Sequence, residues 1–249
     1  MSQEKTDALV IRLADWSESS RVVTLFTRDF GKISALAKGA KRLRSAFEAG
    51  LDLLSESRIV FLRKSSSSLD ILTESQLIAR FQPSSSSLTS LYGGYYVAEL
   101  LSGLSEEYDP HPHLYQVATD TLRSLESDED AQPALLRFEL VLLNEIGSLP
   151  EFDACLVCGC PVNEQRTFAF WVNQGGLICA NCQRPAYQQQ PIDAGAIALL
   201  RKLVDDDPAV ARNVTPSPEQ LTQLRHITTA AVSHVLERRP STLRYLNFD

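Results

Sequence analysis

The first eighty residues alternate hydrophobic and polar positions with a period of two, which is the pattern of half-buried β-strands. Turn-like segments rich in Asp, Ser and Gly separate the runs, and the longest connection extends from Gly39 to Leu51. Five short strands in so few residues predict a small closed barrel, because closure leaves no exposed edge. Both an OB-fold and an SH3-like barrel fit this pattern. The expected strands are residues 8–13, 21–27, 33–38, 58–63 and 69–78.

The pattern changes to a helical period after the polar segment Pro83–Ser87. Apolar residues recur three or four positions apart within 114–125, and the run 135–146 ends at Gly147, a suitable helix C-cap. Ser217-Pro-Glu-Gln220 predicts a capping box that opens a further helix.

The domain organisation expected from these patterns is α+β and multidomain. An N-terminal barrel domain spans 1–82, and a helical domain is built from 88–150 and 189–245. A cysteine-rich module at 151–188 interrupts the helical domain.

Two Cys-x-x-Cys pairs stand in this module, Cys155–Cys158 and Cys179–Cys182. The spacing is typical of a four-cysteine zinc site, in which each pair lies on one tight turn. Such a site has no position left for water, so we expect one structural zinc per chain held by Cys155, Cys158, Cys179 and Cys182.

Other uses of the cysteines stay open at this point. An iron–sulfur cluster takes the same thiolates, and disulfides would need an oxidising compartment. Cys160 is left over, either as a spare thiol or as a ligand in place of Cys158.

Composition and charge narrow the class of protein. The net charge is −7 and 44% of residues are hydrophobic, enough for a packed core. Residues 1–80 hold thirteen Lys or Arg against ten Asp or Glu, and the remainder holds eleven against twenty-one. The N-terminal module is therefore the basic part. The polar N-terminus and the lack of a long apolar run predict a cytoplasmic protein with no membrane span.

A basic cluster at the end of the third expected strand is the candidate nucleic-acid site. Closely spaced cations on an open loop can follow a phosphate backbone. Phe30 and Phe47 flank the cluster and could stack on bases, although such residues are more often in the core. The candidate DNA-binding residues are Lys32, Lys38, Lys41, Arg42 and Arg44. No nucleotide-binding loop, nucleophile elbow or metalloprotease motif is present, so no catalytic residue is expected.

The order of several segments resembles the RecO family of bacterial recombination mediators. No segment is specific alone, but their order and spacing together are, and the resemblance covers nearly the whole chain. The segments are Thr27–Arg42, Tyr95–Leu101, Arg137–Leu143, Gly147–Pro150 and Cys155–Gly159.

The resemblance implies an N-terminal OB-fold, a helical domain and a four-cysteine zinc module. It also implies a nonenzymatic protein near the nucleoid. It implies binding of single- and double-stranded DNA, annealing of complementary strands, and recombinase loading onto strands covered by single-strand binding protein. The implied partners are RecR, the C-terminal tail of single-strand binding protein and, in many bacteria, RecF. The DNA-binding residues of the family map onto Lys38, Lys41, Arg42 and Arg44, and its zinc ligands map onto the paired cysteines. Candidate cations for the acidic tail are Arg123, Arg137 and Arg225.

Two other classes remain as alternatives from sequence. A zinc-stapled interaction scaffold or transcriptional adaptor would also fit, and a nucleic-acid hydrolase is the weaker rival. Annealing without nucleotide would favour the mediator, and strand cleavage would favour the hydrolase.

Overall fold

The structure is a computed structural model that describes residues 2–42, 45, 47, 51–64, 69–84, 87–127, 131–163, 167–187, 189–204 and 216–246. The chain divides into two compact units, Met1–Ala131 and Gln132–Asp249.

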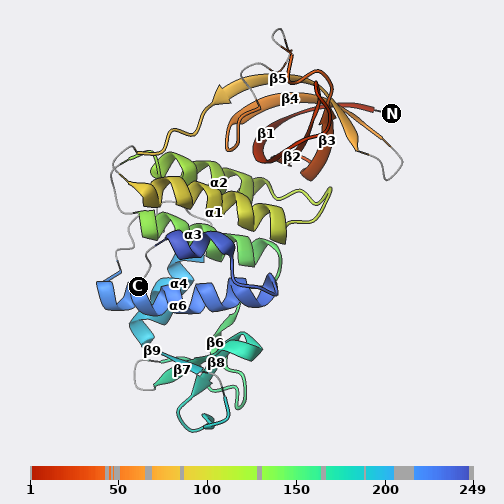
Figure 1. Cartoon of the computed structure of the whole chain (residues 1–249). Coiled ribbons are helices and arrows are strands. Elements are labelled where there is room, and N and C mark those ends of the chain that lie inside the picture. Colours follow the sequence, from red (N-terminus) through yellow and green to blue (C-terminus); the bar gives the residue numbers. More distant parts are fainter. Residues whose placement is uncertain are drawn as a thin grey trace. The chain divides into compact units, whose positions relative to one another are not determined.

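Five strands in the first unit form a barrel (Figure 1). Its order is β1-β2-β3-β5-β4, and β4 pairs back with β1. Only the β3–β5 pair is parallel, and the others are antiparallel. The strands are β1 (Ser2–Asp15), β2 (Arg21–Thr27), β3 (Gly31–Ala37), β4 (Glu56–Arg63) and β5 (Asp70–Ala79).

All five predicted strands are present, and β1 is longer than its hydrophobic pattern indicated. It extends because its first half pairs with β4 while its second half pairs with β2. Strict alternation on β3 buries Ile33, Ala35 and Ala37 inside the barrel. Val23, Ile59 and other members of the same core cluster fill the interior.

Two helices pack with the barrel in the first unit, α1 (Leu88–Leu104) and α2 (Pro112–Ser124). Tyr115 on α2 stacks on Phe26 of β2 with ring centroids 6.4 Å apart. The segment between the helices lies against β3, where the Tyr108 N–H donates to the Lys32 carbonyl at 3.0 Å. Gly31 has φ +66°, and a side chain there would collide with the Asp109 carbonyl. This glycine therefore permits the close approach.

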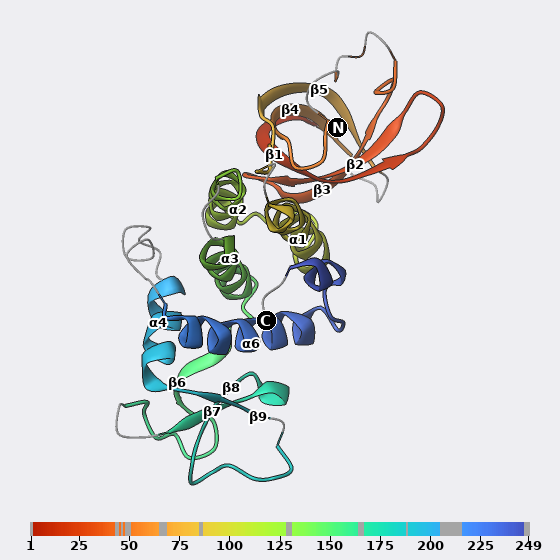
Figure 2. The same ribbon diagram turned by 60° about the vertical axis from the view of Figure 1, so that its left-hand side comes forward.

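The second unit joins helices to a small sheet of order β6-β8-β7-β9 (Figure 2). Helix α6 packs on α3 through an ion pair between Arg225 and Glu139. Their side chains are 1% and 0% exposed. Two nitrogen–oxygen contacts of 2.9 and 2.7 Å make this ion pair bidentate. The elements are α3 (Ala131–Glu145), β6 (Glu151–Cys155), β7 (Phe168–Trp171), η1 (Val172–Gln174), β8 (Gly176–Cys179), β9 (Gln189–Ile192), α4 (Ala194–Val204), α6 (Pro218–Val235) and η2 (Ser241–Tyr245).

The predicted helix boundaries in this unit are confirmed by their capping bonds. Ser217 and Gln220 exchange side-chain-to-backbone bonds at 3.3 and 3.0 Å, which makes the capping box of α6. Gly147 follows α3 with φ +67°, and the Ser148 N–H reaches the Leu143 carbonyl at 2.8 Å. Among the described residues we find no helix long and apolar enough to cross a bilayer. The mixed α+β class is confirmed, while the three domain limits stay a prediction.

Candidate nucleic-acid interface and metal centre

The basic turn, residues 38–42, leaves the barrel at the end of β3. Gly39 has φ +75°, a left-handed conformation that glycine adopts without strain, and the Arg42 N–H donates to the Gly39 carbonyl at 3.1 Å. The turn exposes Lys38 and Arg42, and Lys41 is partly exposed. Three cations are therefore displayed on one short turn.

Contacts with the β1–β2 hairpin, residues 15–21, hold the basic turn in place. The Lys41 N–H donates to the Ser19 carbonyl at 3.1 Å, and the Gly39 N–H donates to the Ser20 hydroxyl at 3.3 Å. The Asp15 carboxylate accepts from Lys41 at 2.8 Å and from Arg21 at 3.2 Å. Hydrogen bonds from Lys41 and then Arg21 lower the pKa of Asp15 below its ordinary 3.8. Asp15 thus orients the cations and also neutralises part of their charge.

Lys32 has a different environment from the rest of the cluster. Its ammonium donates to the Ser102 carbonyl at 2.9 Å, and the side chain is half-buried against the end of α1. Burial lowers the pKa of Lys32, and the charges of Glu106 and Glu107 oppose that effect. Its ammonium is used within the first unit, so we separate Lys32 from the three cations of the turn. Arg44, the fifth candidate, lies outside the described residues.

The two phenylalanines considered for base stacking belong to the barrel interior. Phe47 is 6% exposed in the core cluster, and Phe30 packs edge-on against Phe61 at 5.5 Å. Phe47 therefore has no accessible ring face, and Phe30 is partly buried against the same core. The aromatic residue that the sequence argument missed is Trp16, which is 65% exposed on the β1–β2 hairpin. No periodicity marks it, because it lies in a turn.

The cysteine pairs form two matching turns at the ends of parallel strands β6 and β8. The Gly159 N–H donates to the Cys155 carbonyl at 2.9 Å, and the equivalent Gln183 N–H donates to the Cys179 carbonyl at 3.2 Å. Pairing of Cys155 with Leu177 brings the two turns together. Gly159 has φ +69°, which a tight turn after the first pair requires.

The thiols meet at metal-binding distances. Cys158 Sγ lies 3.8 Å from Cys179 Sγ. A zinc–sulfur bond of about 2.3 Å in a tetrahedron predicts a sulfur–sulfur separation of about 3.8 Å. Burial raises the pKa of Cys155, but the N–H groups of Cys179, Cys158 and Val157 outweigh it and bring the value to about 6. The donor set therefore fits zinc, which binds thiolates.

Five thiols gather at this centre rather than the predicted four. The sulfurs of Cys155, Cys158, Cys160 and Cys179 all lie within 4.8 Å of one another. Cys182 is also close: burial, with contacts to Cys158, Cys179 and Cys155, raises its pKa to about 12. Cys160 is thus a neighbour of the centre, while the matching turns favour Cys182 as the fourth ligand.

The three arginines considered as partners for an acidic tail differ in how exposed they are to solvent. Arg225 is buried in its pair with Glu139, so it cannot serve in the described arrangement, and that prediction is wrong. Arg137 is half-buried on α3. Arg123 is 54% exposed but bonds Glu56 at 3.2 Å and Asp120 at 2.9 Å.

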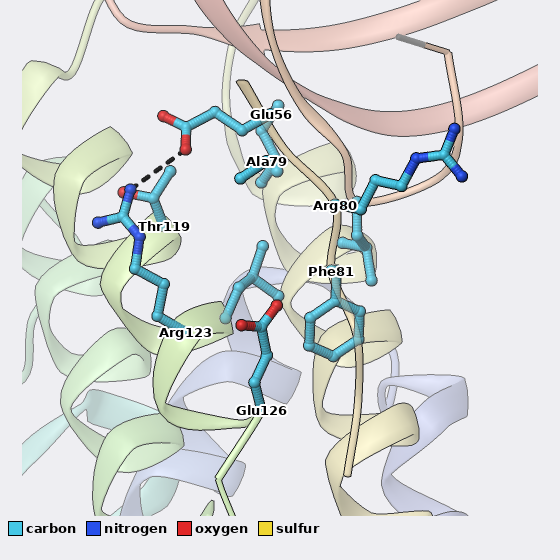
Figure 3. A pocket seen from close by; sticks show the side chains of 10 residues that line it. Glu56, Ala79, Arg80, Phe81, Thr119, Arg123 and Glu126 are labelled. Carbon is cyan, nitrogen blue, oxygen red and sulfur yellow. Dashed lines mark hydrogen bonds and ion pairs between the residues drawn. The ribbon is translucent and has the colours of Figure 1, made fainter. Parts of the chain in front are cut away.

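Arg123 lines a narrow pocket in the first unit. Figure 3 shows its guanidinium turned toward Glu56, with Arg80 and Phe81 on the opposite side. The cavity volume is about 20 Å³, which is room for one or two waters rather than for a peptide side chain. A tail peptide would therefore have to open this pocket.

Comparison with known proteins gives matches along the whole chain. Residues 1–81 match the model of the Recombination protein O N terminal, and residues 85–244 match that of the Recombination protein O C terminal. A "DNA repair protein RecO" of Rhodopirellula baltica is 37% identical over 86% of this chain and 80% of its own length. A protein of the same name from Anaeromyxobacter dehalogenans strain 2CP-1 is 32% identical over 99% of this chain and 97% of its own length. Another, from Bacillus pumilus, is 30% identical over 90% of this chain and 85% of its own length.

Proposed function

We propose that this chain, which belongs to the RecO family of DNA repair proteins, binds DNA through its barrel and anneals complementary single strands. It acts as a mediator without covalent chemistry. The observation that carries the proposal is the exposed basic turn on the N-terminal module, which has excess positive charge while residues 81–249 are acidic overall. Strand order 1-2-3-5-4 supports assigning the barrel as an OB-fold.

The basic turn suits annealing because it grips phosphates rather than bases. The turn carries three closely spaced cations, Lys38, Lys41 and Arg42. Hydrogen bonds from its backbone connect it to the neighbouring hairpin. Backbone contacts position a strand without reading its sequence, and they leave the base edges free to pair. Neutralising two strands at once removes part of their mutual repulsion. Both single- and double-stranded DNA are therefore substrates for binding.

The zinc has a structural role in this proposal. Cys155, Cys158, Cys179 and Cys182 would hold one ion, which would fix the β6 and β8 turns. Four sulfur ligands leave no position for water, so the metal supplies stability and no reaction.

Partner binding completes the proposed activity. With RecR, and with RecF as a further candidate, the protein would help to load a recombinase onto strands covered by single-strand binding protein, whose acidic C-terminal tail it would bind. The acidic charge of residues 81–249 supports partner contact there over extensive DNA contact. Its place would be the cytoplasm, near the nucleoid.

An annealing assay tests the proposal. Complementary labelled oligonucleotides are mixed with the full chain, without nucleotide or added metal, and duplex formation is followed over time. Acceleration over the spontaneous rate is expected, and it should be lost in Lys38→Ala/Lys41→Ala/Arg42→Ala. Strand cleavage would instead indicate a hydrolase. If the folded protein neither anneals nor binds DNA, an interaction scaffold would be the better description.

A further inference from the structure

Trp16 is exposed at the tip of the β1–β2 hairpin. Trp16 is 65% exposed. Among the exposed large hydrophobic residues that the structure describes, only Leu88 has a larger exposed fraction. The tip is tight: the Trp16 N–H donates to the Ser20 carbonyl at 3.0 Å, and the Ser20 N–H donates to the Ser17 hydroxyl at 3.2 Å. These bonds therefore fix the backbone from which the Trp16 side chain extends.

A single exposed apolar residue carries no function by itself, and the surroundings of Trp16 decide the matter. The adjacent Asp15 holds Lys41 and Arg21 in ion pairs. Three residues after Trp16, the Ser19 carbonyl accepts the Lys41 N–H of the basic turn. The hairpin that carries Trp16 is therefore in direct contact with the basic turn, whose cations would follow a phosphate backbone.

The outer face of the barrel next to the hairpin tip carries a short row of apolar residues. Ala14, Val22 and Leu36 lie in register across β1, β2 and β3. Their neighbours Val23 and Ala35 are buried inside the barrel, so the register row faces outward. An aromatic ring, a short aliphatic row and flanking cations match the amphipathic character of an unpaired nucleotide.

We propose that Trp16 is a stacking platform for a base of single-stranded DNA whose phosphates are held by Lys38, Lys41 and Arg42. The proposal rests on the proposed function and adds to it a preference for unpaired strands. Stacking needs an accessible base face, and a duplex hides its faces within the helix. Phosphate contact alone would not distinguish the two forms of DNA.

Tryptophan fluorescence can test the contact directly. The chain has two tryptophans, and the other, Trp171, stacks on Tyr187 at 4.0 Å in the second unit. In a Trp171→Phe background, Trp16 is the only reporter. An oligothymidine strand should quench its emission, whereas saturating duplex of the same length should leave it nearly unchanged.

Substitution of the indole gives the second readout. Trp16→Ala should weaken oligothymidine binding about 5- to 150-fold, the range for one stacked base. The slope of log affinity against log salt should not change, because the indole neutralises no phosphate. Trp16→Phe should retain most of the affinity, since it keeps an aromatic face. Leu88→Ala, which removes a side chain that is 72% exposed, is the matched control and should bind normally.

The outcomes separate this inference from the proposed function. Saturated single-strand binding with unchanged Trp16 emission, or normal affinity in Trp16→Ala, would overturn the stacking role alone. Failure of the unsubstituted protein to bind any DNA would overturn both proposals.

Discussion

Removing Lys38 and Arg42 together should reduce the salt dependence of single-strand binding by a calculable amount. Both side chains are exposed on the basic turn. Each phosphate neutralised on single-stranded DNA contributes roughly 0.7 to the slope of log affinity against log salt. Lys38→Ala/Arg42→Ala should therefore flatten the slope by about 1.4. Between about 50 and 200 mM salt, this removes roughly a sevenfold change in affinity.

Asp15→Asn should act in the opposite direction. The carboxylate now holds Lys41 at 2.8 Å and Arg21 at 3.2 Å, so it competes with phosphates for both. Lys41 is already counted among the phosphate contacts, so only the released Arg21 adds a new one. The slope should steepen by up to about 0.7, and affinity should rise at low salt. The basic turn should stay in place, because the backbone bond from Lys41 to Ser19 remains. In the unsubstituted protein, Lys41 and Arg21 lower the pKa of Asp15. The Asp15 carboxylate should therefore keep its charge between about pH 5 and 8.

Fluorescence anisotropy with labelled oligonucleotides of two unrelated sequences measures these slopes. Both sequences should respond alike, because backbone contacts carry no base information. Lys202→Ala/Arg184→Ala removes two exposed charges from the second unit and serves as the matched control. An unchanged slope in a folded Lys38→Ala/Arg42→Ala protein would refute the assignment of this turn and redirect the search to Arg63 and Lys64.

Three further predictions concern stability and metal content. Gly31→Ala should lower the unfolding free energy by more than about 2 kcal/mol, measured by urea denaturation, because it adds left-handed strain to a collision with Asp109. Glu139→Ala should cost about 3–5 kcal/mol by leaving the Arg225 charge buried, and a loss below about 1 kcal/mol would contradict this. Elemental analysis should find about one zinc per chain, lost in Cys155→Ser and kept in Cys160→Ser. Zinc loss in Cys160→Ser would instead make Cys160 a ligand.

Local sequence determined the secondary-structure elements and the cysteine ligands of the candidate metal centre. The period-two pattern of the first eighty residues predicted five strands, and each is present because alternation fixes which side chains enter the barrel. Ser217 with Gln220, and Gly147, marked helix ends through bonds that involve only near neighbours. The paired cysteines likewise encode their own turns.

Only the tertiary structure decided which aromatic rings are exposed to solvent and which charged side chains are held in contacts within the protein. Lys32 belongs to the basic run in sequence, yet long-range packing brings its ammonium to Ser102, seventy positions away. Arg225 resembles any surface cation until the packing of α6 on α3 buries it against Glu139. Trp16 gains its candidate role because the β1–β2 hairpin and the basic turn meet through the Asp15 contacts. Periodicity reports the burial expected of one element alone, whereas the pairing of charges and the exposure of a ring depend on which distant elements pack together.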